Sequence, residues 1–129
     1  MSILKKLLLS APAIVIAVTI FILSNSPHPG LPELGIEWED KIMHISAYFA
    51  FGIALVLFFV VNLQVPEIKK VAFITIFIGS FYGLTDEFHQ YFIPGRSSEI
   101  LDWIADVLGV LLSVTTIKFL KIRLLKPVS

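Results

Sequence analysis

The sequence has no cysteine among its 129 residues and few charged side chains. Without cysteine, disulfides, thiolate nucleophiles and cysteine-ligated zinc are excluded. Charged residues make up 16% and hydrophobic residues 57% of the chain, whereas soluble domains have about 25% charged residues. Lys and Arg together equal Asp and Glu, at ten each, so no excess of positive charge favours a nucleic-acid partner. These absences favour a membrane protein that forms a single domain over residues 1–129.

Four long stretches of the sequence contain almost no charge. A helix of roughly 20 residues crosses the hydrocarbon core of a membrane, and helices satisfy their own backbone hydrogen bonds there. The first stretch has the basic start and apolar core that a signal peptide also has, and this alternative stays open, but its exit lacks the small-residue cleavage pattern and Pro27 follows directly after SNS (24–26). We therefore expect an all-α, four-helix polytopic membrane protein. The expected transmembrane helices cover about 4–24, 41–63, 71–93 and 99–122, and an irregular outer loop rich in Pro and Gly covers 25–39.

Basic residues predict the orientation of these helices. If the four helices alternate, eight of the ten basic residues lie on one side, and only Lys41 and Arg96 lie on the other. Lys and Arg are enriched in cytoplasmic loops, so both termini are predicted to be cytoplasmic. The eight residues on the cytoplasmic side are Lys5, Lys6, Lys69, Lys70, Lys118, Lys121, Arg123 and Lys126.

Three of the expected helices carry a stripe of polar residues on one face. At about 100° per residue, the members of the stripes in the second and third helices share an arc of about 100°, and those in the fourth share a narrower one. The third stripe also contains Gly79 and Gly83, whose GxxxG spacing lets helices approach closely. The stripes consist of Asp40, Lys41, His44 and Tyr48 in the second helix, Asp86, Glu87 and Gln90 in the third, and Glu99, Asp102 and Asp106 in the fourth.

The three stripes are predicted to lie at one depth in the membrane. With a rise of 1.5 Å per residue, Asp86 lies roughly 22 Å above Val71, and Asp106 lies roughly 7 Å inside the start of its helix. His44 lies within about 10 Å of the start of its own helix by the same rise. Ionisable groups inside a membrane are costly, so they tend to face the bundle interior, pair with one another and mark function. We therefore expect a shared polar pocket in the outer leaflet.

A purely structural interpretation of these residues stays open. Asp40 and Asp102 suit the N-termini of helices, where the helix dipole favours a negative charge. Glu99 suits the same place if Ser98 caps the fourth helix. The whole set could be a network of ion pairs and hydrogen bonds that only joins the helices. His89 faces away from its stripe and His28 lies in the outer loop, so both are interpreted as incidental.

The sequence resembles the VanZ family of small bacterial membrane proteins. The similar stretches are DKIMHISAYFAFG (40–52), TDEFHQYFIPGRSSEILDWIADVLG (85–109) and the SNS before the outer loop, about 70 residues together. One departure is Asp106, where the family commonly has asparagine. The resemblance implies a multi-pass protein of the bacterial plasma membrane. It also implies a link to low-level resistance to glycopeptide antibiotics such as teicoplanin, whose acyl tail embeds in the membrane.

The first functional hypothesis is a binding protein. The pocket would bind or remodel a membrane lipid, a cell-wall lipid precursor or a lipid-tailed glycopeptide, with Tyr48 and Gln90 lining the site. Pro94 and Gly95 favour a tight turn that would place Arg96 over the pocket, paired with one of the acids. Six acids oppose two basic residues there, so an anionic headgroup would be repelled unless a cation bridges. The acids are Asp40, Asp86, Glu87, Glu99, Asp102 and Asp106.

Two further hypotheses stay open. In an intramembrane enzyme acting on a lipid or cell-wall precursor, His44 would be a general base beside Asp86 or Glu87 as the acid. A divalent metal held by Asp86, Glu87, His44 and Asp106 would suit the same chemistry. The DExxQ pattern lacks the paired histidines of a strong metal motif, so no catalytic residue is assigned. The third hypothesis is a structural or partner-binding scaffold. The sequence leaves the ligand, the metal and the oligomeric state open.

Overall fold

A computed structural model describes residues 1–27, 35–36, 38–63 and 67–125 of the protein. Over these residues the chain is entirely helical, and four helical segments are long and apolar enough to cross a membrane. The expected all-α, four-helix bundle is therefore confirmed. The elements are α1 (Ile3–Ser24), α2 (Glu39–Asn62), α3 (Ile68–Gln90), α4 (Ile100–Ser113), a 3-10 helix η1 (Val114–Thr116) and α5 (Ile117–Leu125).

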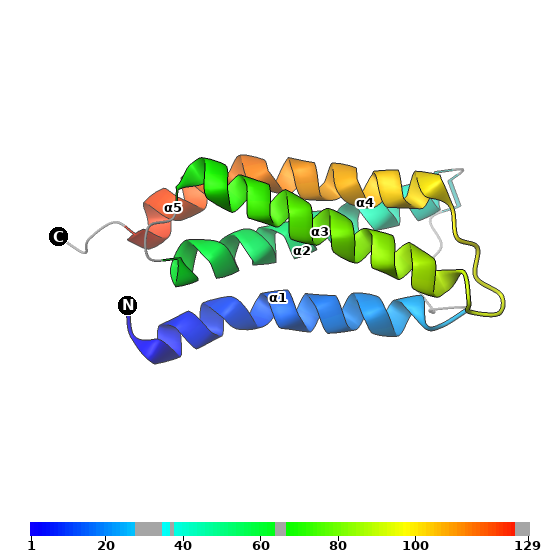
Figure 1. Ribbon diagram of the computed structural model, residues 1–129, viewed down its shortest axis with the longest axis horizontal. Helices are drawn as coiled ribbons and strands as arrows, with labels where there is room; N and C mark the ends of the chain where they lie inside the picture. The colour runs from blue at the N-terminus through cyan, green and yellow to red at the C-terminus, as the bar shows by residue number, and fades with distance from the viewer. Residues whose placement is uncertain (28–34, 37, 64–66, 126–129) are drawn as a thin grey trace.

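The helices pack lengthwise around α2. It contacts every other spanning helix and packs most extensively against α4. By contrast, α1 lies at the edge of the bundle, mainly against α2 and with a smaller contact to α3 (Figure 1). The start of α1 and the end of α5 lie at the same end of the bundle (Figure 1).

Small residues allow α2, α3 and α4 to approach closely. A Cβ added at Gly109 of α4 would lie only 2.8 Å from the backbone nitrogen of Phe49 on α2. On α3, a Cβ at Gly79 would lie 2.7 Å from the side chain of Val110, and one at Gly83 would lie 3.0 Å from that of Asp106. The GxxxG face of α3 therefore packs against α4, as such spacing favours in membranes.

The connection between α3 and α4 differs from the expected boundaries. α3 ends at Gln90 rather than near residue 93, because the N–H groups of Phe92 and Ile93 bond only three residues back, to the carbonyl oxygens of His89 and Gln90. A residue before proline avoids helical dihedrals, so Pro94 explains why the helix stops. Gly95 has a φ of +83°, which is the tight turn expected there.

The fourth span is not one continuous α-helix. The hydroxyl groups of Ser113, Thr115 and Thr116 donate to carbonyl oxygens three residues earlier, at 2.6–2.7 Å. Such local bonds compete with the regular helical ladder, and a 3-10 turn tightens the chain at this point. The expected helix over 99–122 is therefore divided into α4, η1 and α5.

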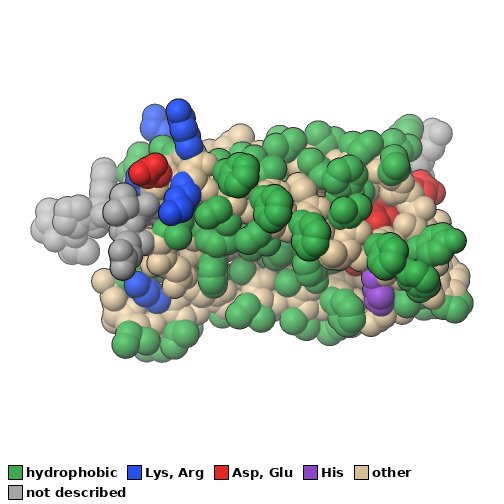
Figure 2. Space-filling model, viewed as in Figure 1, with side chains coloured by type: hydrophobic (Ala, Val, Ile, Leu, Met, Phe, Trp, Pro, Cys, Tyr) green, Lys and Arg blue, Asp and Glu red, His purple; other side chains and the backbone are tan. Residues whose placement is uncertain are grey.

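Charge separates the two ends of the bundle. Lys and Arg side chains gather at the end where α1 begins, which we call the basic end, and acids gather at the opposite, acidic end (Figure 2). One acid, Glu67 before α3, lies at the basic end. Much of the expected loop over 25–39 lies outside the described residues, and so do His28 and Lys126.

Candidate functional site

The acidic end holds a set of polar side chains that we call the polar cluster. The start of α2, the end of α3 and the start of α4 meet there. Most of these side chains are buried between the three helices, although Asp40 and Glu99 are exposed. The polar cluster comprises Asp40, Lys41, His44, Tyr48, Asp86, Glu87, Gln90, Glu99, Asp102 and Asp106.

Lys41 of α2 is the cation of the polar cluster. Its Nζ lies 3.0 Å from Glu99 Oε2 and 3.3 Å from Asp40 Oδ2, and it makes its closest contact with Asp102 Oδ1. Asp102 is almost fully buried, with 1% of its side chain exposed. A buried carboxylate needs a partner of opposite charge, so Lys41 compensates Asp102 and joins α2 to α4.

His44 lies among acids from three helices. Its Nδ1 is 2.7 Å from Oδ1 of Asp106 on α4 and 4.0 Å from Oε1 of Glu87 on α3. Its Nε2 is 4.0 Å from Oδ1 of Asp40, one turn earlier on α2. The hydrogen bond to Asp106 fixes the direction of the imidazole ring, so His44 is held with a defined orientation between Glu87 and Asp106.

Asp86 has only neutral partners among the described residues. The hydroxyl of Tyr48 donates to Asp86 Oδ2 at 3.4 Å, and the amide of Gln90 donates to the same oxygen at 3.3 Å. Asp86 is 7% exposed and Gln90 is 2% exposed. Neutral donors hydrogen-bond to a carboxyl group without balancing its charge, so Asp86 is an acid of the site that has no cationic partner among the described residues.

Glu87 has one satisfied and one unsatisfied oxygen. Its Oε2 accepts from the backbone N–H of Glu99 at 3.2 Å and from the hydroxyl of Ser98 at 3.3 Å. Its Oε1 is buried and has no hydrogen-bond partner among the described residues, and the same holds for Oδ2 of Asp106. The expected N-cap role of Ser98 is wrong, because Glu99 precedes α4 and the Ser98 hydroxyl donates to Glu87 instead.

Arg96 does not take the expected position. It is half-buried, and it forms no ion pair with any residue that the structure describes. Its expected partners have nearer donors: Glu87 accepts from Ser98 and Glu99, and Asp102 pairs with Lys41. Among the described residues, the cation that pairs with these acids is therefore Lys41 rather than Arg96.

His89 lies apart from the polar cluster, as its position on α3 indicated. Its ring stacks on Phe21 of α1 with a centroid distance of 5.2 Å. The hydroxyl of Tyr82 donates to the backbone oxygen of Ala17 at 2.6 Å, one turn earlier on α1. These two contacts attach α1 to α3 near the acidic end.

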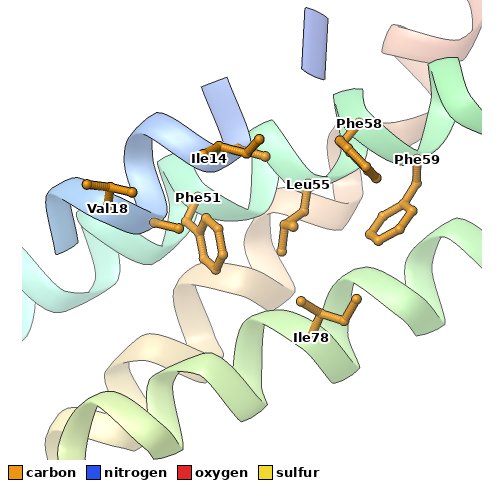
Figure 3. A pocket seen from close by; sticks show the side chains of 9 residues that line it. Ile14, Val18, Phe51, Leu55, Phe58, Phe59 and Ile78 are labelled. Carbon is orange, nitrogen blue, oxygen red and sulfur yellow. The ribbon is translucent and has the colours of Figure 1, made fainter. Parts of the chain in front are cut away.

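An apolar cavity of about 330 Å³, wide open to the surface of the bundle, lies between α1, α2 and α3, and its lining residues Ile14 and Val18 are exposed (Figure 3). Phe51 lines it, and the rings of Phe51 and Tyr48 pack edge to face with their centroids 6.1 Å apart. The cavity therefore adjoins the polar cluster. The sequence analysis missed this cavity; its one signal was the small pair Ala13 and Ala17, one turn apart on α1. All nine lining residues are hydrophobic: Ala13, Ile14, Ala17, Val18, Phe51, Leu55, Phe58, Phe59 and Ile78.

The arrangement favours cations and hydrogen-bond donors over anions. The polar cluster contains six carboxyl groups, whereas its positive charge comes from Lys41 and from His44 when protonated. The burial of most of these groups strengthens their electrostatic effect, because the surrounding dielectric constant is low. An ammonium group, a hydroxyl, an amide or a metal ion is therefore a better match for this site than a bare phosphate.

Comparison with known families agrees with this structure. The VanZ/LLP1 family model matches residues 12–121, which is most of the chain. The chain belongs to the VanZ/LLP1 family. The match confirms the resemblance seen in the sequence, and with the four apolar helices it establishes a multi-pass membrane protein. No curated protein and no solved structure matches the chain.

The part of the chain matched to VanZ/LLP1 contains both the acidic end of the bundle and the apolar cavity nearer its middle. The polar cluster lies within it, and so does every residue that lines the apolar cavity. In this VanZ/LLP1 protein, Asp106 is fully buried beside His44, so the departure noted in the sequence lies at the centre of the polar cluster.

Proposed function

We propose that this VanZ/LLP1 protein binds an amphiphile of the bacterial cell envelope, either a lipid or a lipid-tailed glycopeptide such as teicoplanin. The observation that carries the proposal is the contact between the apolar cavity and the polar cluster through Phe51 and Tyr48. The acyl chain would occupy the cavity, and the polar head would lie against the carboxyl groups.

The dimensions of the cavity support a chain-shaped ligand. Its wall on α2 runs from Phe51 to Phe59, which is eight residues or about 12 Å along the helix. A volume of about 330 Å³ falls at the lower end of ordinary ligand pockets, which hold roughly 300–1,000 Å³. The cavity therefore has room for part of an acyl chain but not for a glycopeptide core.

The charge of the polar cluster limits the headgroup. Sugar hydroxyls, amides and amines donate hydrogen bonds to carboxylates, so a glycopeptide or an amine-bearing lipid is a suitable partner. A phosphate headgroup is repelled by the carboxylates unless a cation accompanies it. This selectivity is opposite to that of a site built around arginine.

We also propose that the polar cluster faces the outer leaflet of the plasma membrane, because the basic end carries most of the Lys and Arg side chains. Cysteine labelling tests the orientation directly, since the chain has no cysteine of its own. Ser97→Cys should react with an impermeant reagent in intact cells, and Lys70→Cys should react only after lysis. The reverse pattern would place the polar cluster at the cytoplasmic leaflet and overturn this part of the proposal.

Filling the cavity tests the binding proposal. Ala17→Phe places a large ring in the cavity, whereas Ile22→Phe enlarges an exposed residue five positions along the same helix. In nanodiscs, Ala17→Phe should weaken binding of a fluorescent acyl-chain phosphatidylethanolamine at least about tenfold, as loss of two or more buried methylenes would. Ile22→Phe should not change it.

The same pair of variants separates lipid from drug. If teicoplanin is the ligand, Ala17→Phe should remove protection of cells against teicoplanin and leave unchanged their response to the same glycopeptide without its acyl chain. Equal binding and equal protection by wild type, Ala17→Phe and Ile22→Phe would refute the amphiphile proposal.

A second candidate function is an intramembrane acid–base enzyme. The hydrogen bond of 2.7 Å between His44 and Asp106 favours it, because a general base works best when a carboxylate orients its ring. Glu87 would be the acid, since its Oε1 lies 4.0 Å from His44. His44→Gln should then leave phosphatidylethanolamine binding intact and change the abundance of one lipid class in mass spectra of whole-cell extracts. Unchanged spectra would exclude the enzyme.

The scaffold hypothesis predicts a different pattern. If the polar cluster only joins α2, α3 and α4, the double variant Asp86→Asn, Glu87→Gln should lose stability in detergent and lose function in proportion. If the cluster binds a ligand, function should be lost while the purified protein keeps its unfolding temperature within a few degrees.

A further inference from the structure

Two buried carboxylate oxygens of the polar cluster have no hydrogen-bond partner among the described residues. They are Oε1 of Glu87 and Oδ2 of Asp106, and neither accepts a hydrogen bond from any described residue. Glu87 is 5% exposed and Asp106 is fully buried. An unsatisfied buried acceptor costs about 1–3 kcal/mol, and more when it is charged. Two such atoms, on the two acids that flank the His44 imidazole, therefore indicate a place for a further positive partner.

The three side chains converge from three helices. His44 on α2, Glu87 on α3 and Asp106 on α4 each offer one ligand atom, and these atoms all lie within 4.8 Å of one another. We propose that His44, Glu87 and Asp106 bind one divalent transition-metal ion, Zn²⁺ or Mn²⁺. The site needs neither the apolar cavity nor an amphiphile, so it stands or fails separately from the proposed function.

The donor set selects the class of metal. One imidazole nitrogen with two carboxylates suits zinc and related transition metals, whereas Mg²⁺ prefers oxygen ligands and retains water. Bonds of about 2.0–2.2 Å in a tetrahedral site separate ligand atoms by roughly 3.3–3.5 Å. The distances from His44 Nδ1 to Asp106 and Glu87 are 2.7 and 4.0 Å, one below and one above this range. Metal binding would therefore require the imidazole to move away from Asp106 and toward Glu87.

Surrounding groups already hold one proposed ligand, Glu87, in place. Ser98 and Glu99 both donate to Oε2 of Glu87, which leaves Oε1 available to a metal. Asp40 lies 4.0 Å from Nε2 of His44, the nitrogen that the metal would not use, so a small movement would bring a carboxylate behind the ring. Metal sites commonly have carboxylate partners behind a ligating histidine and hydrogen bonds behind a ligating carboxylate.

A neighbouring group of residues is a weaker candidate. Asp40, His44 and Asp102 also place three ligand atoms within 4.8 Å of one another. However, Lys41 already pairs with both Asp40 and Asp102, and the Asp40 side chain is 65% exposed. The set with Glu87 and Asp106 is the one with unsatisfied, buried oxygens.

Three protein ligands leave further positions on the metal open. A water molecule or a phosphate oxygen of a lipid can occupy one, and the positive ion offsets the charges of Glu87 and Asp106. The metal would therefore reverse the preference of the polar cluster and let it accept an anionic headgroup.

Metal binding is tested on the purified full chain in phosphatidylcholine nanodiscs, which carry no anionic lipid. After treatment with a chelator, the protein should bind one Zn²⁺ or Mn²⁺ per chain and show a higher unfolding temperature with Zn²⁺ than with Mg²⁺. Glu87→Gln and Asp106→Asn should weaken binding at least about tenfold. Asp86→Asn removes an acid from the same cluster but no ligand, and should change affinity less than about threefold.

Pulsed EPR of bound Mn²⁺ gives a second measurement that does not depend on stable acid variants. The wild type should show coupling to one imidazole nitrogen, which His44→Gln removes and His89→Gln retains. Absence of stoichiometric binding in the wild type, equal weakening by Asp86→Asn and Glu87→Gln, or bound Mn²⁺ without nitrogen coupling would each overturn the proposal.

Discussion

Helix α1 and the span that begins with α4 are both apolar enough to cross a membrane, yet α4 and α1 differ in the contacts that build the site. In an apolar stretch of 18 residues within the span that includes α4, 39% of the residues are buried, against 17% in the corresponding stretch of α1. α4 brings the buried acids Asp102 and Asp106 and the close-packed Gly109 into the bundle. α1 has no charged residue after Lys6 and contributes one wall of the apolar cavity.

The two helices differ in what they contribute to the structure. α2, α3 and α4 form a unit in which ion pairs, a histidine and close glycine contacts position the polar cluster. α1 is attached by fewer polar contacts, such as the hydrogen bond from Tyr82 to Ala17 and that from Asn62 to Ser10. Changes in α4 should therefore disrupt the whole protein, and changes in α1 should affect the cavity alone.

The largest expected effect comes from a larger side chain where α2 and α4 approach most closely. Gly109→Leu would force a side chain against the backbone of α2 near Phe49, which cannot move aside, and should cost about 3 kcal/mol or more. Ala11→Leu adds similar bulk on an exposed face of α1 and should be tolerated. Size-exclusion chromatography in detergent checks both. A folded, monodisperse Gly109→Leu protein would contradict the tight packing of α4.

The next effect concerns the ion pair between α2 and α4. Lys41→Met leaves Asp102 buried without its cation, which typically costs about 3–5 kcal/mol. Adding Asp102→Asn to that variant should recover much of the loss, because the uncompensated charge is removed. Denaturant unfolding in detergent measures both proteins. If the double variant is no more stable than Lys41→Met, the pair does not explain the burial of Asp102.

A smaller effect is expected where α1 joins α3. Tyr82→Phe removes the hydrogen bond to Ala17 and should cost about 0.6 kcal/mol, the average for such bonds in membranes. Tyr91→Phe, at an exposed position, is the control. Amide hydrogen exchange should rise in α1 and stay unchanged in α4. A uniform rise across both helices would argue against an independent attachment of α1.

The smallest effect is expected at Arg96, in the connection that leads into α4. Because it has no ion pair among the described residues, Arg96→Gln should change the free energy of unfolding by less than about 0.5 kcal/mol. The same unfolding measurement compares it with Lys41→Met. A loss as large as that of Lys41→Met would show that Arg96 compensates a buried acid in the membrane.

The fold could be predicted from the sequence because membrane helices depend on local properties. Length, hydropathy and spacing are local, so the four spans and the polar stripes follow from helix geometry alone. The meeting of His44 with Asp106 follows from the same depth argument. That these residues bind a ligand stays a prediction, because closeness of polar groups is not itself evidence of binding.

The details that escaped prediction depend on packing and on the path of the chain. The choice of Lys41 rather than Arg96 as the paired cation depends on how residues 91–99 run between α3 and α4. Ser98 bonds to Glu87 because that connection folds back over the end of α3. The cavity depends on how α1 rests against α2 and α3, and no periodic pattern within one helix encodes a space between three.

The glycine contacts also constrain how this sequence can change over evolutionary time. A larger residue at Gly79 meets the side chain of Val110, so a smaller residue at 110 can compensate for it. Gly52 and Ser113 form a second such pair, in which each residue limits the size of the other. Gly109 faces the backbone of α2, for which no substitution can make room. Residues 79 and 110 can thus change size together, as can residues 52 and 113. At position 109 no change in another side chain can make room for a larger residue.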